Sequence, residues 1–170
     1  LLAGGNYELT GEAYYKTTQN IIDYKDGKNF NSEIEVDRII RSGEGRSYGI
    51  EVLLRKNSGR LTGFVGYTLS WSENKIPGIN NGQWYTAAND RRHDISVALM
   101  YQITKKWDIS ATWTFQSGQA FSAPSAKYDI NNETIYYYAE RNGYRAPSYH
   151  RLDISANCRR QHVTKSGRKW

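Results

Sequence analysis

The chain has 170 residues, a net charge of +6 and a mean hydropathy of −0.77, and its length suits a single domain. No apolar run approaches the roughly eighteen residues of a transmembrane helix. The basic residues are mixed with acids along most of the chain, which argues against the basic patch or stripe of a nucleic-acid-binding protein. Cys158 is the only cysteine, and this excludes a disulfide framework.

The first predicted strand covers residues 7–16, where apolar and charged side chains alternate with period two. Residues 21–24 could extend this strand. The polar segment 25–44, which contains an Asp-Gly turn signal and a short run at 34–40, is expected to be a long loop that could contain a small hairpin.

The most regular stretch, residues 46–71, consists of two alternating runs on either side of the turn 57–60. Gly59 stands in that turn, where a left-handed residue is favoured, and the stretch therefore predicts a β-hairpin. One face of the hairpin is apolar and the other is polar. Leu53 and Phe64 are the apolar exceptions on the polar face.

Three further strands are predicted by the same alternation. Two long connections rich in Asn, Gly and Tyr lie before and between them, together with one tight Thr-Lys-Lys turn. The predicted strands are 94–103, 107–116 and 149–158, the long loops are 73–92 and 117–148, and the tight turn is 104–106.

The predicted connections alternate in length, which places the long loops at one end of a meander and the tight turns at the other. A strand of about eleven residues tilted by about 40° rises ~28 Å, the thickness of the hydrocarbon layer. Aromatic residues stand near both strand ends, as in the girdles of membrane barrels. The sequence thus predicts an all-β, antiparallel, up-and-down transmembrane β-barrel. The alternative is a soluble β-sandwich, whose apolar face would meet a second sheet.

The number of predicted strands limits what this chain can form by itself. Six strands and the start of a seventh at 169–170 are too few to enclose a polar lumen, since small membrane barrels need about eight. Lipid also tolerates no open sheet edge. We therefore expect the chain to be a piece of a larger barrel, and to begin inside a longer protein.

Several ordered motifs identify a family. They are YGIEVLLRK with the second half of the hairpin (48–70), NDRRHD (89–94), WTFQSG (113–118) and RNGYRAPSYHRLD (141–153). Together these motifs resemble the C-terminal barrel of TonB-dependent receptors. They are most similar to the group that carries an N-terminal carboxypeptidase-regulatory-like domain.

The resemblance implies an outer-membrane transporter of a Gram-negative bacterium, with a plugged barrel of about 22 strands. Residues 1–170 would be part of that barrel, while the plug domain and the remaining strands would lie outside this chain. The implied function is import of a scarce nutrient (a glycan, siderophore, peptide or vitamin) with energy transmitted by TonB. The implied partners are outer-membrane lipid, the TonB complex through the plug and a small nutrient ligand. A surface lipoprotein is a further candidate partner, and a non-energised porin or adhesin barrel remains an alternative.

No site for chemistry is apparent in the sequence. There is no nucleophile constellation, and the three histidines lie on separate segments without metal-ligand spacing. We therefore expect neither enzymatic activity nor a metal or cofactor.

Two groups of side chains are expected to line the lumen of the barrel. Asp94, Arg151 and Asp153 are predicted to form a charge network on the wall, because ionic groups there must be paired; contact with a ligand at the mouth is the alternative. Leu53 and Phe64 are predicted to pack against the plug.

Aromatic and basic residues of the long loops are the candidates for ligand binding. Aromatic rings could stack on a sugar ring or on the aromatic groups of a siderophore. They could equally pack the loops together or contact a lipoprotein. The candidate ligand-binding residues are Trp84, Tyr85, Arg91, Arg92, Tyr137 and Arg145.

Overall fold

The protein is described by a computed structural model that covers residues 2–4, 6–24, 40–130 and 133–159. The predicted seventh strand at 169–170 and the part of the predicted loop at 25–39 lie outside these residues. The described part of the chain contains no helix long and apolar enough to cross a membrane.

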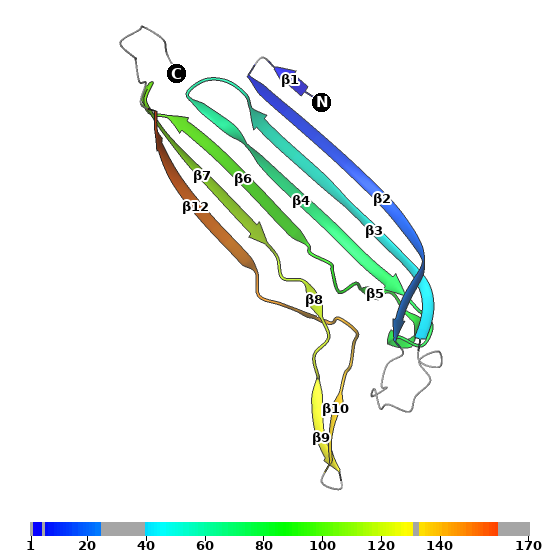
Figure 1. Cartoon of the computed structure of the whole chain (residues 1–170). Helices are drawn as coiled ribbons and strands as arrows, with labels where there is room; N and C mark the ends of the chain where they lie inside the picture. The colour runs from blue at the N-terminus through cyan, green and yellow to red at the C-terminus, as the bar shows by residue number, and fades with distance from the viewer. Residues whose placement is uncertain (1, 5, 25–39, 131–132, 160–170) are drawn as a thin grey trace, which may run out of the picture.

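The chain folds into one long, curved, antiparallel sheet in which consecutive long strands are neighbours (Figure 1). A short strand, β5 (Tyr85–Thr86), pairs with the far end of β4. The long path through the sheet runs in the order β1 (Leu2–Gly4), β2 (Tyr7–Tyr24), β3 (Ile40–Lys56), β4 (Leu61–Lys75), β6 (His93–Gln102), β7 (Trp107–Gln116) and β12 (Tyr149–Cys158).

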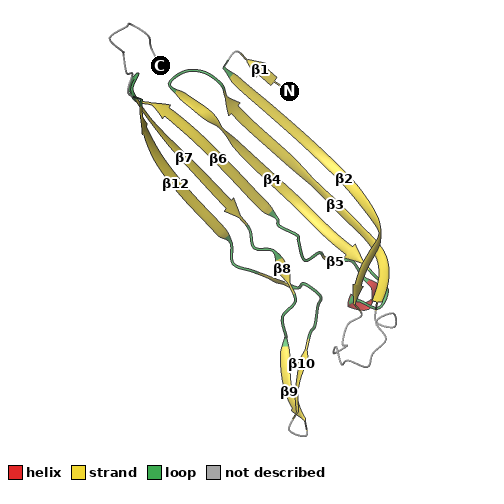
Figure 2. Cartoon of the chain, viewed as in Figure 1, coloured by secondary structure: helices red, strands yellow, loops and turns green. Residues whose placement is uncertain are grey.

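The hairpin β3–β4 is the predicted one, and Gly59 adopts the expected left-handed backbone with φ of +96°. The tight turns lie at one end of the sheet and the long connections at the other (Figure 2). The bounds of β7 and β12 equal those predicted, and β6 begins and ends one residue earlier than predicted.

β3 and β4 extend into the predicted loops, so two loop boundaries were wrong, and the possible extension of the first strand over residues 21–24 is confirmed. β2 continues to Tyr24 through a shift in register between Gln19 and Ile21, where Asn20 adopts a φ of 58°. Its extension pairs with residues of β3 inside the predicted loop 25–44. Likewise β4 runs on to Lys75, because its last residues pair with both β3 and β5.

The predicted loop 117–148 contains secondary structure that the sequence did not reveal. β8 (Ala120–Phe121) pairs with β11 (Tyr144–Arg145), and between them β9 (Ala126–Ile130) and β10 (Glu133–Tyr137) form a hairpin. This β9–β10 hairpin projects away from the sheet (Figure 1). A single 3-10 turn, Asn80–Gly82, lies in the connection between β4 and β5.

The strand register places all predicted apolar faces on the same side of the sheet. Val65, Val97, Trp113 and Leu152 are successive partners across β4, β6, β7 and β12. No second layer of described residues covers this side, and Ile154 at its edge is 73% exposed. The described residues therefore supply no second sheet of the kind that a soluble sandwich requires.

The only buried apolar cluster of the described residues lies beyond the loop ends of the strands. Ile76 and Ile79 are fully buried, Tyr85 is 4% exposed, and Ile21 of β2 packs against them. The hydrophobic effect thus folds the loops together, while the sheet itself keeps its apolar side free. This loop end is where the predicted functional residues gather.

Candidate functional site at the loop end of the sheet

The buried carboxylate of Asp90 is the centre of the loop-end structure. Its side chain is 1% exposed, and its Oδ1 accepts a 2.7 Å hydrogen bond from the backbone N–H of Ser72 in β4. The guanidinium of Arg145 pairs with Oδ2, and that of Arg92 lies 3.4 Å from the same oxygen. Two cations therefore balance one buried anion, as a buried charge requires.

Arg92 and Arg145 are predicted ligand-binding residues, and both are engaged within the protein. The Arg92 guanidinium also lies over the ring of Trp71 at 4.6 Å, a cation–π contact. Arg145 additionally donates to the backbone oxygens of Asp90 and Gly118. Their contact with a ligand stays a prediction; their observed contacts join the β4–β6 and β7–β12 connections.

Hydrogen bonds from Arg141 and Asn142 connect distant parts of the loop end. The Arg141 guanidinium donates to the Asp23 carboxylate at 2.7 Å and to the Tyr24 carbonyl at 3.0 Å. The amide of Asn142 donates to the carbonyl of Thr86 at 2.9 Å. The connection after β7 is thereby bound both to the end of β2 and to β5.

Tyr85, another predicted ligand-binding residue, is buried in the apolar cluster rather than displayed. Its hydroxyl lies 3.4 Å from the carboxylate of Asp23. Burial, followed by the Asp23 charge, raises the pKa of Tyr85 to about 12, because both disfavour the phenolate. The Tyr85 ring therefore packs the loops together, which was the alternative to ligand stacking in the sequence-based prediction.

Trp84 is half-buried and lies between two cations. The guanidinium carbon of Arg46 is 4.2 Å from its ring centroid, and the Lys75 ammonium is 6.0 Å away. Arg46 in turn donates from Nε to Glu73 at 2.8 Å. The ring therefore belongs to an aromatic and ionic cluster at the loop end of β3 and β4.

The three residues of the predicted lumen charge network all lie on the polar face, in two separate groups. Arg151 and Asp153 form an ion pair of 2.8 Å along β12. Asp94 instead accepts a 2.8 Å hydrogen bond from the side chain of Gln116, whose oxygen pairs with the predicted ligand-binding Arg91. No hydrogen bond or ion pair of the described residues joins Asp94 to Arg151 or Asp153.

Leu53 and Phe64 lie on the polar face, as their positions in the alternation predicted. Leu53 is opposite Gly66 and lines an open concavity of about 350 Å³ together with Thr10, Glu12 and Glu51. Phe64 lies between Arg55 and Ala98 and is 36% exposed. Their contact with a plug stays a prediction.

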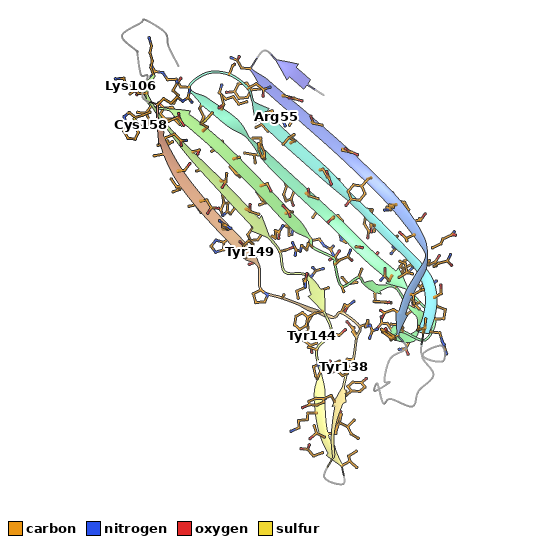
Figure 3. The ribbon with its side chains drawn as sticks, in the orientation of Figure 1. Arg55, Lys106, Tyr138, Tyr144, Tyr149 and Cys158 are labelled. Carbon is orange, nitrogen blue, oxygen red and sulfur yellow. The ribbon has the colours of Figure 1, made fainter. Side chains whose placement is uncertain are left out.

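The exposed tyrosines of the β9–β10 hairpin form a surface, and Tyr137 is the one among them that was predicted to bind a ligand. Tyr128 and the predicted Tyr137 lie on one face of the hairpin, and each is 54% exposed. Tyr136 is 56% and Tyr138 is 53% exposed; Figure 3 shows Tyr138 near the hairpin and Tyr144 where the hairpin joins the sheet. The run of three tyrosines was the available signal, but it does not alternate and so did not predict a strand.

No group of His, Cys, Asp and Glu side chains in the described ranges could hold a metal ion. The polar groups of the loop end are mostly paired with one another. The arrangement is therefore suited to holding loops in place and to presenting the projecting aromatic hairpin.

Comparison with known proteins places this sheet in a family. The family model described as TonB dependent receptor-like, beta-barrel matches residues 2–164. No curated protein and no solved structure matches. The chain therefore belongs to the TonB-dependent receptor-like β-barrel family, and its antiparallel sheet is a fragment of such a barrel.

Membership of this family defines the class of protein. The family consists of outer-membrane receptors and transporters rather than enzymes. The apolar side of the sheet is then the side that faces lipid, and the polar side lines the lumen, as in membrane barrels generally.

Proposed function

We propose that this chain forms part of the barrel wall of a transporter that imports a scarce nutrient with energy passed from TonB. The observation that carries this proposal is the two-faced sheet of the family, which combines an apolar outer side with a polar inner side. Residues 1–170 then belong to the barrel, and the plug domain lies elsewhere in the protein. The nutrient is a glycan, a siderophore, a peptide or a vitamin.

The long connections are proposed to face the cell exterior and the tight turns the periplasm of a Gram-negative bacterium. This orientation puts the β9–β10 hairpin at the mouth, where its tyrosines can stack on a ring-containing nutrient. We also propose that a surface lipoprotein, if the receptor has one, contacts this hairpin, because its tyrosines are exposed. The motif resemblance also supports the group with an N-terminal carboxypeptidase-regulatory-like domain.

Inside the barrel, Leu53 and Phe64 are proposed to pack against the plug. Both are apolar side chains on an otherwise polar face, and Leu53 lies in a concavity into which a neighbouring domain could fit. Burial of such side chains under the plug would remove apolar surface from lumen water.

Conductance of the full-length protein tests whether the barrel is plugged. The purified protein, inserted into a planar bilayer in KCl, is expected to conduct only when urea loosens the plug. It is also expected to bind the purified periplasmic domain of TonB in a pull-down. Steady open channels without urea, together with no TonB binding, would favour a non-energised porin and contradict the proposal.

A further inference from the structure

Four cations that form no ion pair with another described residue lie at the turn end of the sheet, opposite the loops. We define the basic rim as Lys56, Arg60, Lys105 and Lys106. Arg60 lies in the β3–β4 turn, and both Lys105 and Lys106 lie in the β6–β7 turn. A backbone hydrogen bond from the Gln102 N–H to the Arg60 carbonyl (2.8 Å) holds these two turns side by side. A second, from the Arg159 N–H to the Lys106 carbonyl (2.7 Å), joins the end of β12 to the β6–β7 turn. Figure 3 shows Lys106 at this end, next to Cys158.

The acidic residues nearby are already neutralised. Asp108 is 4% exposed and accepts from Arg159 at 3.0 Å and from Asn157 at 3.1 Å. Glu8 faces Arg55 at 4.0 Å. None of the four rim cations forms an ion pair with a carboxylate of another described residue, and the rim therefore carries an excess of positive charge.

The cations of the loop end contrast with those of the rim. There Arg46, Arg141 and Arg145 are each bound to a carboxylate. Several arginines of the loop end are therefore neutralised by carboxylates, whereas none of the four rim cations forms an ion pair with another described residue.

The rim adjoins an aromatic belt on the lipid-facing side. Tyr7, Tyr101 and Trp107 are 54%, 42% and 48% exposed, and such rings settle at the level of lipid headgroups. The Lys56 ammonium lies 4.4 Å from the centre of the Tyr7 ring. The rim cations are thus held at the depth where lipid phosphates lie.

We propose that the basic rim is a binding site for anionic phospholipid headgroups, with the rim ammonium and guanidinium groups contacting the lipid phosphates. Each cation near an anionic membrane surface favours binding by about fivefold. The site itself requires only that the barrel is in a membrane. Its assignment to the periplasmic leaflet rests on the orientation proposed above.

Lipid retention by the full-length receptor tests the site. The receptor is equilibrated in mixed micelles of equimolar phosphatidylglycerol and phosphatidylcholine, and the co-purified lipids are counted by native mass spectrometry. Wild type is expected to retain phosphatidylglycerol in at least about fivefold preference, the contribution of a single cation. The variant Lys56→Gln, Arg60→Gln, Lys105→Gln, Lys106→Gln is expected to lose most of this preference, and high salt is expected to weaken the wild-type preference.

A matched control removes the same charge elsewhere. The double variant Lys16→Gln, Lys75→Gln, matched to the double rim variant Arg60→Gln, Lys106→Gln, should keep the wild-type preference, since these exposed cations lie outside the rim. If the fourfold rim variant does not fold, Arg60→Gln with Lys106→Gln should show a partial loss. An unchanged preference in the rim variant, or an equal loss in the control, would overturn the proposal. Because no transport is measured, a closed, TonB-binding receptor without this lipid preference would contradict this inference alone.

Discussion

At the scale of single residues, Asp90 links the loops to the sheet through charge. Its Oδ1 accepts a hydrogen bond from the Ser72 N–H, and its Oδ2 pairs with the guanidinium groups of Arg92 and Arg145. Because both cations are partly withdrawn from water, removing the anion costs more than losing a surface ion pair would. Asp90 is thus the residue through which the two long connections depend on each other.

Asp90→Asn keeps the shape of the side chain and an oxygen for the Ser72 N–H, but removes the charge. We expect it to destabilise the loop end by about 3 kcal/mol, the scale for breaking a buried pair. Hydrogen exchange in residues 117–148 of the full-length receptor should accelerate accordingly. The control Asp129→Asn affects an exposed pair with Lys127 at 3.8 Å and should change stability by less than about 1 kcal/mol. Equal exchange in both variants would contradict the central role of Asp90.

Tyr85 predicts a dependence of loop stability on alkaline pH. Its folded-state pKa of about 12 exceeds the value of about 10 expected in the unfolded chain. The folded state therefore retains the Tyr85 hydroxyl proton to a higher pH than the unfolded chain does. The contribution of this protonated hydroxyl to stability is complete below pH ~10 and is lost as the pH rises towards ~12. Denaturant unfolding of wild type and Tyr85→Phe over this range should show the additional loss in wild type only. Parallel curves for the two proteins would refute the assignment.

At the scale of elements, the β4–β6 pairing depends on a close backbone approach at Gly63. Gly63 has φ of +143°, and a Cβ there would lie 2.0 Å from the Ala98 carbonyl oxygen. A side chain at this position would have to push β6 away from β4. The glycine is therefore part of the strand pairing and not merely tolerated by it.

Gly63→Ala is expected to destabilise the barrel by about 2–3 kcal/mol, through strain and overpacking. The matched control is Gly11→Ala. Gly11 lies in β2 on the same side of the sheet as Gly63, and a Cβ there would meet nothing within 4 Å. Thermal unfolding of the two full-length variants in detergent should separate them clearly. A Gly63→Ala variant as stable as Gly11→Ala would show that the strands can shift apart at little cost.

At the scale of the whole molecule, the sheet separates two environments. Ile50 and Glu51 are adjacent in β3 and point to opposite sides, and Ile50 is 51% exposed on the apolar side. A free energy of about 25 cal/mol per Å² opposes leaving such apolar surface in water. Lipid on this side removes that cost without a second protein layer.

Spin labels on Ile50→Cys and Glu51→Cys test this separation in the reconstituted full-length receptor, after Cys158→Ser. The label at position 50 should be relaxed strongly by oxygen, which partitions into lipid, and weakly by a water-soluble nickel complex. The label at position 51 should be less sensitive to oxygen. Equal oxygen sensitivity at both positions would contradict a wall with one lipid-facing side.

Much of the sheet could be predicted, because apolar and polar residues alternate along the chain and this alternation can be read directly from the sequence. The bounds of β7 and β12, the turn at Gly59 and the shared apolar face all followed from period two. The β9–β10 hairpin did not, because its strands are short and project from the sheet without the pattern of a buried face. Residues 21–24 were predicted as a possible extension of the first strand and do extend β2, although the bulge at Asn20 interrupts the alternation.

The sequence by itself determined the six long strands, their two faces and the end at which the long loops gather, since each depends on neighbouring residues. Only the tertiary structure decided what the loop residues do. Arg145 meets Asp90 across 55 positions and Arg141 meets Asp23 across 118. Such pairings depend on how the strands place the loops in space, and composition can name the charges but not their partners. For that reason five predicted ligand residues are found in contacts within the loop end of the protein: Trp84, Tyr85, Arg91, Arg92 and Arg145.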